Sequence, residues 1–121
     1  MEVYDHAGGK LHICRLARKG NVNRRDRWMQ ERLLRVWTPA GFDVEHWKRD
    51  PKGIPVLYMN DGQNMFEDWI AHQGQAWNIG YAAAHLIGSK ALPPFIIVGI
   101  DGAGPYRRAL GCVQCRDHLG A

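Results

Sequence analysis

Hydrophobic positions along the chain form short runs, separated by segments rich in glycine, proline and charge. The run at 95–101 (FIIVGID) is continuous and rich in β-branched residues, which predicts a buried strand. The run at 56–59 holds four apolar residues in a row, which predicts a strand covered on both faces, as in a parallel sheet. Alternating apolar positions predict a short edge strand at 11–16, and another strand is predicted at Glu31–Thr38.

Apolar residues recur with helical spacing between residues 77 and 90. Those that share one predicted helix face are Ile79, Ala83, Leu86 and Ile87. Gly88 is placed to end this helix, and Pro93-Pro94 prevents its continuation. Strand, loop, helix and strand then form a βαβ unit, for which a right-handed parallel crossover is expected. The predicted class is α/β, with about three to four strands and one clear crossover helix.

The remaining segments predict little regular structure. Residues 1–10 are polar and predict a loose start, residues 42–53 predict a polar connector, and residues 109–121 show neither period. The predicted organisation is a basic lead-in over 1–30 with a candidate edge strand, a partial α/β domain over 31–108, and the irregular tail 109–121. Because no element follows the last predicted strand, that strand is expected near an open edge, which native sheets normally cover.

Composition indicates one globular domain. The chain has 121 residues, 45% hydrophobic content and five tryptophans, which argues against disorder. No stretch approaches the roughly 20 apolar residues of a membrane helix. The N-terminus has an early acidic residue and no apolar core segment, so no secretory signal is expected and a cytoplasmic location is the default. The three cysteines, an odd number, fit a reducing compartment.

Charge is distributed unevenly along the sequence. Between Lys10 and Arg35 there are nine Lys or Arg residues against two acids, whereas from Val56 to Asp101 there is one base against four acids. The basic residues at 18–27 could contact phosphate backbones. No nucleic-acid fold signature accompanies them, so a solvated loop is the favoured interpretation and nucleic acid is not a favoured partner.

Three segments carry a resemblance to a known family, in the family's order: 34–42 (LRVWTPAGF), 55–66 (PVLYMNDGQNMF) and 94–101 (PFIIVGID) followed by Arg107-Arg108. Together with the helix that begins at Trp77, they resemble the enterochelin-esterase-like and feruloyl-esterase-like family of α/β-hydrolases. The resemblance spans residues 31–108, about two thirds of the chain. One departure is Asn60, where many members carry a histidine; the change affects local hydrogen bonding more than the backbone.

The resemblance implies a role for the loop that follows the 56–59 strand. In α/β-hydrolases the corresponding loop contributes one backbone N–H to the oxyanion hole. Gly62 and Gln63 are the implied contributors, and Asp61 and Asn64 the residues that shape the turn. A glycine permits close backbone approach. The alternative is that Asp61-Gly62 is only a tight turn at the end of a strand.

The nucleophile that the family requires is missing from this sequence. The fold carries it in a G-x-S-x-G elbow between a strand and a helix. The one serine is Ser89, at a predicted helix end and without a glycine two residues later, so a surface role is expected. Six histidines are present, and each is expected to be a surface or loop residue rather than a triad base: His6, His12, His46, His72, His85 and His118.

Three other patterns were weighed as functional sites. Cys112, Cys115 and His118 have partial zinc spacing, but a structural zinc site needs four ligands and no second pair exists, so an exposed cysteine pair in the tail is favoured over a metal site. Residues 102–104 (GAG) form an incomplete nucleotide-binding fingerprint. Asp101 ends a strand at the edge where α/β ligands bind, so it either lines the substrate mouth or is simply a polar strand end.

Two functional interpretations follow. The first is an esterase-type hydrolase, acting by family on a small-molecule ester without metal or cofactor, whose rear part is missing, which leaves this chain inactive. The second is a non-catalytic α/β-derived domain that binds a partner or is a remnant. No membrane partner is expected, and self-association through an open sheet edge is plausible on physical grounds.

Overall fold

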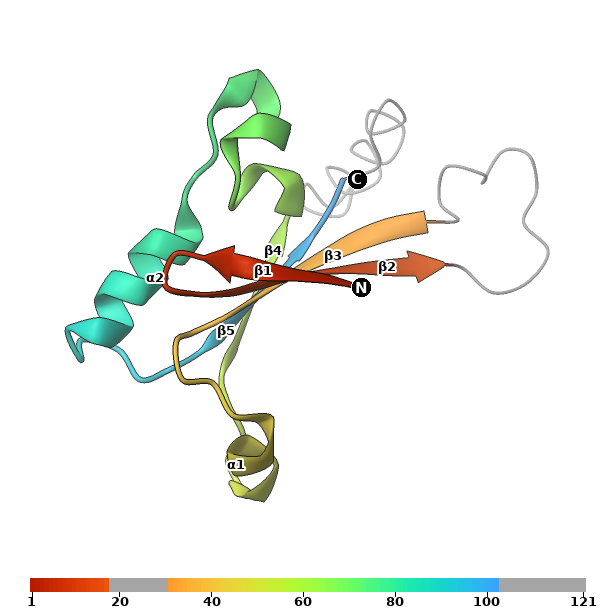
Figure 1. Ribbon diagram of the computed structural model, residues 1–121. Coiled ribbons are helices and arrows are strands. Elements are labelled where there is room, and N and C mark those ends of the chain that lie inside the picture. Colours follow the sequence, from red (N-terminus) through yellow and green to blue (C-terminus); the bar gives the residue numbers. More distant parts are fainter. Residues whose placement is uncertain (18–30, 103–121) are drawn as a thin grey trace, which may run out of the picture.

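A computed structural model describes residues 1–17 and 31–102 of the protein. Its centre is a five-stranded mixed sheet in the order β1-β2-β3-β5-β4 (Figure 1). The strands are β1 (Glu2–His6), β2 (Gly9–Ala17), β3 (Glu31–Thr38), β4 (Val56–Asn60) and β5 (Ile96–Ile100). β1, β2, β3 and β5 pair antiparallel in succession, and β4 pairs parallel with β5. The coarse prediction of an α/β class is confirmed, and the sheet continues across the boundary drawn at residue 31.

The first ten residues form a β-hairpin, so the prediction of a loose start is wrong. Ala7 and Gly8 have φ values of 51° and 77°, which suits a two-residue hairpin turn and lets His6 pair with Gly9. β2 occupies the predicted 11–16 but lies between β1 and β3, so the prediction that it forms a sheet edge is also wrong. The hairpin adds β1 as a further strand outside β2. The loop-like composition of residues 1–10 gave no pattern from which β1 could be predicted.

The two strands of the βαβ unit lie where the sequence predicts them, but neither has the surroundings predicted for it. β5 was expected near an open edge; it lies between β3 and β4. β4 was expected to be covered on both faces; it is the edge strand, and Tyr58 within it is 69% exposed. The parallel crossover from β4 to β5 is confirmed. After the crossover, β5 takes the position between β3 and β4. The apolar runs in the sequence do not determine this strand order.

The described residues form two α-helices, α1 (Val44–Arg49) and α2 (Ile79–Gly88). α2 lies within the predicted 77–90 and ends at Gly88, as expected. α1 lies inside the segment predicted as a connector, where Asp43 caps it by accepting a hydrogen bond from the Glu45 amide. It has six residues and buries none of them, so it leaves no hydrophobic period in the sequence.

The hydrophobic core lies on the sheet face that α2 covers. Leu11, Trp37 and Ile97 are adjacent in register across three strands and fully buried. Phe66, from the loop after β4, and Ala83, from α2, complete the contact. The Trp37 indole nitrogen donates to the His6 carbonyl at 3.0 Å, which ties the hairpin to the core. Neither helix in the described part of the chain is long and apolar enough to cross a membrane.

His6 packs against the edge of the core. Its ring makes edge contacts with Phe66 and Tyr81, at centroid distances of 6.0 and 5.3 Å. Its Nε2 is buried without a hydrogen-bond partner, and a Cβ placed on Gly80 would lie 3.1 Å from the ring. This burial lowers the pKa of His6 below its ordinary 6.5, partly opposed by Glu67. The expectation of a surface histidine is therefore wrong at this position.

Folding stability is expected to fall as the pH drops below about 6.5. In the window between the lowered folded-state pKa of His6 and its unfolded-state value, the unfolded chain binds a proton that the folded chain does not. The stabilisation by neutral His6 is therefore complete above that window and lost on acidification. Urea midpoints measured between about pH 8 and pH 5 check this. His6→Phe should flatten the profile relative to wild type, whereas His72→Gln, at an exposed position, should leave it unchanged. If the urea midpoint fell with pH equally in wild type and in His6→Phe, the pH dependence could not be assigned to His6.

Candidate functional site

A tight turn follows β4 at its carboxyl end. Asp61 adopts a left-handed conformation (φ 56°, ψ 50°) and starts the short 3-10 helix η2, Gly62–Asn64. The first hydrogen bonds of the turn are donated by Asn64 to the Asp61 carbonyl (2.9 Å) and by Met65 to the Gly62 carbonyl (3.1 Å). The amides of Gly62 and Gln63 precede them and have no acceptor within η2, as at any helix start. Both residues predicted as oxyanion donors thus lie in one turn.

The turn is pressed against the backbone of β5. A Cβ added to Gly62 would lie 2.6 Å from the Gly99 carbonyl carbon and 2.8 Å from its oxygen. A Cβ added to Gly99 would lie 2.9 Å from the Gly62 Cα. Two glycines are therefore needed for the backbones to approach this closely. Their contact fixes the turn at the carboxyl edge of the parallel pair, where ligands bind in open α/β sheets.

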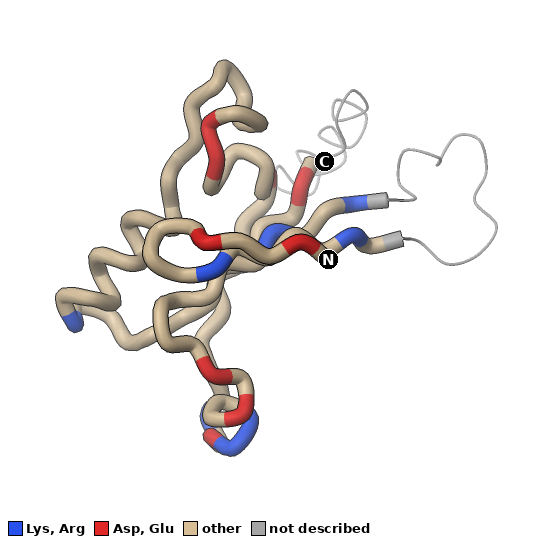
Figure 2. Tube along the Cα trace, in the orientation of Figure 1, with Lys and Arg blue, Asp and Glu red and all other residues tan. Residues whose placement is uncertain are grey.

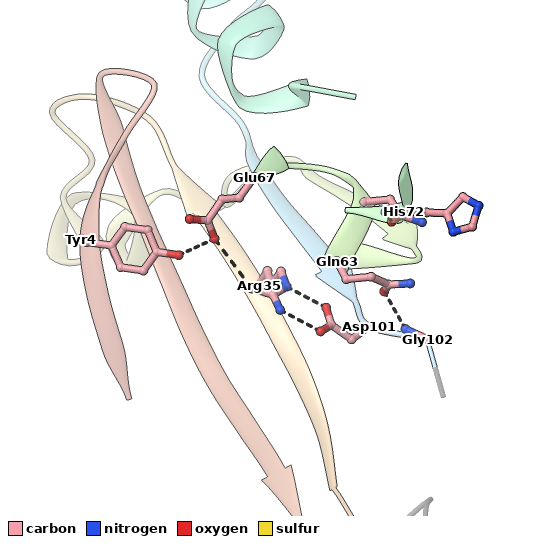
Figure 3. Close-up of polar contacts among 8 residues, drawn as sticks. Tyr4, Arg35, Gln63, Glu67, His72, Asp101 and Gly102 are labelled. Carbon is pink, nitrogen blue, oxygen red and sulfur yellow. Dashed lines mark hydrogen bonds and ion pairs between the residues drawn. The ribbon is translucent and has the colours of Figure 1, made fainter. Parts of the chain in front are cut away.

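Side chains of the turn hold the neighbouring loops. The Gln63 side-chain oxygen accepts a hydrogen bond from the Gly102 amide at 2.8 Å, which joins the loop after β4 to the end of β5 (Figure 3). The Asn64 side-chain oxygen accepts from the His72 amide at 2.8 Å, and the Asn64 carbonyl accepts from the Trp77 amide at 2.9 Å. Asn64, which is expected to shape the turn, thus also connects it to the segment that leads into α2.

Beside the turn lies a buried ionic network that the sequence analysis did not foresee. Arg35, on β3, donates two hydrogen bonds to Asp101, of 2.8 and 2.9 Å (Figure 3). The Arg35 side chain is 7% exposed and that of Asp101 is 14% exposed. Glu67 lies 3.9 Å from Arg35 and accepts a hydrogen bond from the Tyr4 hydroxyl. The network links β1, β3, β5 and the loop after β4 on one face of the sheet.

Tyr4 takes part in this network through its hydroxyl, which donates to Glu67. Burial, and then the hydrogen bond to the negatively charged Glu67, raise the pKa of Tyr4 to about 12. The phenol therefore stays protonated and donates to the carboxylate at neutral pH. Asp101, weighed above as a residue of the substrate mouth, is held by Arg35. A signal for the network was present in the sequence, because Arg35 alternates with Trp37 on a strand and so shares its buried face.

The other candidate residues do not join the turn in a catalytic arrangement. Ser89 is exposed at the end of α2 and donates to the Leu86 carbonyl at 3.3 Å, as expected for a helix terminus. His12 pairs with Thr38 (3.2 Å), and His46 lies against Trp47. No group of three or more histidine, cysteine, aspartate or glutamate residues in the described ranges is placed to hold a metal ion. The candidates that lie outside the described residues are Cys112, Cys115, His118, the basic residues at 18–27, 103–104 and Arg107-Arg108.

Comparison with known proteins adds no assignment. No protein-family model matches the sequence, and no curated protein is found to be similar to it.

Proposed function

We propose that the chain is the front part of an esterase-type α/β-hydrolase, and that its turn after β4 forms one half of an oxyanion hole. The observation that carries the proposal is the packing of Gly62 on Gly99, which holds the Gly62 and Gln63 amides at the carboxyl edge of the parallel strands. The sequence of this turn, DGQN, is the most specific part of the resemblance to esterases.

The chemistry of acyl transfer explains why such a turn is useful. Attack on an ester carbonyl places negative charge on its oxygen, and a backbone N–H that is already oriented stabilises that charge without reorganisation. One such donor contributes about 2.7–4 kcal/mol in the transition state. The Gln63 side chain, bonded to Gly102, and the left-handed Asp61 hold the turn in one conformation. Rigid support of this kind favours a preorganised donor.

The 121 residues lack the nucleophile that an esterase needs. Ester hydrolysis through an acyl-enzyme needs a nucleophile with an adjacent base, and no G-x-S-x-G segment occurs in the sequence. Ser89 is hydrogen bonded at a helix end, away from any strand-to-helix elbow.

Hydrolysis of p-nitrophenyl acetate by the 121-residue chain tests the missing nucleophile. We expect no rate above that of the Ser89→Ala variant, because an oxyanion donor without a nucleophile forms no acyl-enzyme. A burst or a steady rate that Ser89→Ala abolishes would refute this part. Sequencing the complete transcript tests the other part, since we expect G-x-S-x-G followed by Asp or Glu and then His outside these residues. A complete reading frame without them would end the hydrolase proposal.

If a longer active protein is found, the donor itself can be examined. Gln63→Pro removes the backbone N–H, and Gln63→Ala keeps the N–H while deleting the bond to Gly102. The proline variant should lower kcat by about 10²–10³, and the alanine variant by much less. Equal losses in both would show that the side chain, and not the amide, supports activity.

A further inference from the structure

Two side chains of β1 hold the segment that follows the turn after β4. Tyr4 and His6 lie on the core face of β1, because residues two apart on a strand share a face and Tyr4 is in register with the buried Leu11. The Tyr4 hydroxyl donates to Glu67, toward which it points in Figure 3. The His6 ring makes edge contact with Phe66. β1 therefore holds two consecutive residues that come shortly after the turn.

The His6 ring lies between Phe66 and the first turn of α2. A Cβ placed on Gly80, in that first turn, would lie 3.1 Å from the Cδ2 atom of His6 and 3.3 Å from its Nε2. On its other side, Phe66 reaches β5, since a Cβ placed on Gly99 would lie 3.3 Å from the Phe66 ring. Gly99 is also the residue on which Gly62 packs. Contacts therefore run without a break from His6 to the turn after β4.

The segment between β4 and α2 depends on this packing, because its own backbone is strained. Asp61, Gln73 and Asn78 have φ values of 56°, 60° and 55°, a left-handed conformation that is costly for residues with a Cβ. Asn78 precedes α2 but makes no side-chain capping bond. The Ile79 amide instead donates to the Met65 carbonyl at 3.0 Å, so the start of α2 is fixed by the segment after the turn. Strained segments with few contacts of their own are among the first to open locally.

Protonation of His6 would weaken the same packing. Its Nε2 is buried and has no hydrogen-bond partner among the described residues, which suits the neutral ring. A proton would add a full positive charge beside the amino end of α2, where the helix dipole is also positive. α2 contains no aspartate or glutamate that could offset this charge, and Figure 2 shows the helix without an acidic position.

The other ionisable groups around His6 do not balance such a charge. On the elements packed against it they are Tyr4 of β1, Arg35 of β3, Glu67 of the loop after β4, and Tyr81 and His85 of α2. Glu67 is the one carboxylate among them, and Arg35 lies 3.9 Å from it. It also accepts hydrogen bonds from Tyr4 and Trp69. Asp5 and Lys10 lie on the opposite face of the hairpin. Burial therefore lowers the pKa of His6, although Glu67 opposes the shift.

We propose that His6 is an acid-sensitive latch: when its ring is protonated, residues 64–66 and the first turn of α2 separate from β1, while β2, β3 and β5 stay paired. The separation removes the packing behind Phe66, so Gly62 is no longer held against Gly99. Neutral His6 keeps the turn after β4 in its fixed position. The latch itself does not depend on the hydrolase proposal; only a loss of the oxyanion donor in acid would rest on it.

Amide hydrogen exchange of the full chain between about pH 8 and pH 5 tests the latch, with rates corrected for the intrinsic pH dependence of exchange. Below about pH 6.5, the protection factors of the Met65, Trp77 and Ile79 amides should fall by up to about tenfold per pH unit, because the open form binds one proton more than the closed form. The paired amides of β2 and β3 should stay more protected at every pH. The fall should depend little on urea at low concentration, since a local opening exposes little surface.

Two variants assign the effect to His6. His6→Phe keeps an aromatic ring that cannot take a proton, so its protection factors should not change with pH in this range. His85→Gln is the matched control, because it removes an exposed imidazole from α2 itself and should keep the wild-type pH dependence. If His6→Phe fails to fold by circular dichroism, His6→Leu replaces it, and the wild-type exchange pattern still decides.

Four results would overturn the proposal. In wild type these are protection of the three amides equal to that of β2 and β3 at every pH, or protection that does not change with pH. In the variants they are a pH dependence that the His6 variant retains, or one that His85→Gln abolishes. Because exchange reports the opening and not hydrolysis, an inactive chain leaves the test unaffected.

Discussion

Replacing Arg35 by methionine is expected to lower the free energy of unfolding by about 3–5 kcal/mol. Arg35 makes two hydrogen bonds to Asp101 and lies near Glu67, and all three side chains are largely buried. Methionine matches the length of the aliphatic stem but leaves two carboxylates without their cation. The loss of stability arises because the buried carboxylates no longer have a counter-charge. The free-energy penalty of this unpaired buried charge is larger than the net contribution of the intact ion pair.

Chemical denaturation of Arg35→Met beside two further variants measures this effect. Lys48→Met breaks the exposed pair with Glu45, whose side chains are 66% and 64% exposed, and should cost about 0–1 kcal/mol. In the double variant Arg35→Met/Asp101→Leu, one stranded carboxylate is removed, so part of the loss should be recovered. A loss for Arg35→Met no greater than for Lys48→Met would show that the network contributes little to stability.

Gly62→Ala is expected to destabilise the protein by about 1–3 kcal/mol. The new methyl group would lie 2.6 Å from the Gly99 carbonyl carbon and 2.8 Å from its oxygen. Both of these are backbone atoms, which cannot rotate away as a side chain could. The turn after β4 would have to move off β5 and weaken the bond between Gln63 and Gly102. The variant therefore examines the contact on which the functional proposal depends.

Gly88→Ala is the matched control for Gly62→Ala. Gly88 ends α2, and a Cβ added there meets nothing within 4 Å. Alanine has the higher helix propensity, so this variant should be neutral or stabilised by up to about 1 kcal/mol. Thermal melts of the two variants should separate clearly. A Gly62→Ala variant as stable as wild type would mean that the turn and β5 are not in close contact.

Local sequence pattern located most elements of the fold. The runs at 56–59 and 95–101 are strands, and the helical period at 77–90 contains α2, because each is specified by residues near one another in the chain. β1 and α1 were not predicted, because prediction from sequence depends on such a local pattern. β1 is five residues with polar ends, and α1 buries nothing, so neither leaves a periodic hydrophobic pattern.

In the candidate site, too, features that depend on neighbouring residues could be predicted, and contacts between distant residues could not. The turn at Asp61–Asn64 was located from the sequence because turn-forming residues immediately follow an apolar run, whereas the roles of Gly62 and Gln63 are implied only by the family resemblance. The ion pair between Arg35 and Asp101 joins residues that are 66 positions apart in the sequence. The local pattern around either residue therefore does not predict that the two side chains meet. The contact of Gly62 with Gly99 likewise exists only once β4 and β5 are paired.

The amino-acid sequence by itself determined the α/β class, the βαβ unit, the turn DGQN and the absence of a G-x-S-x-G nucleophile. These are properties of local periodicity and composition. Only the tertiary structure decided that β1 and β4, and not β5, are the outer strands of the described sheet, and that Asp101 is held by Arg35. Strand order and buried ion pairs depend on which distant segments meet, because many apolar runs can pair equally well until the whole chain is packed.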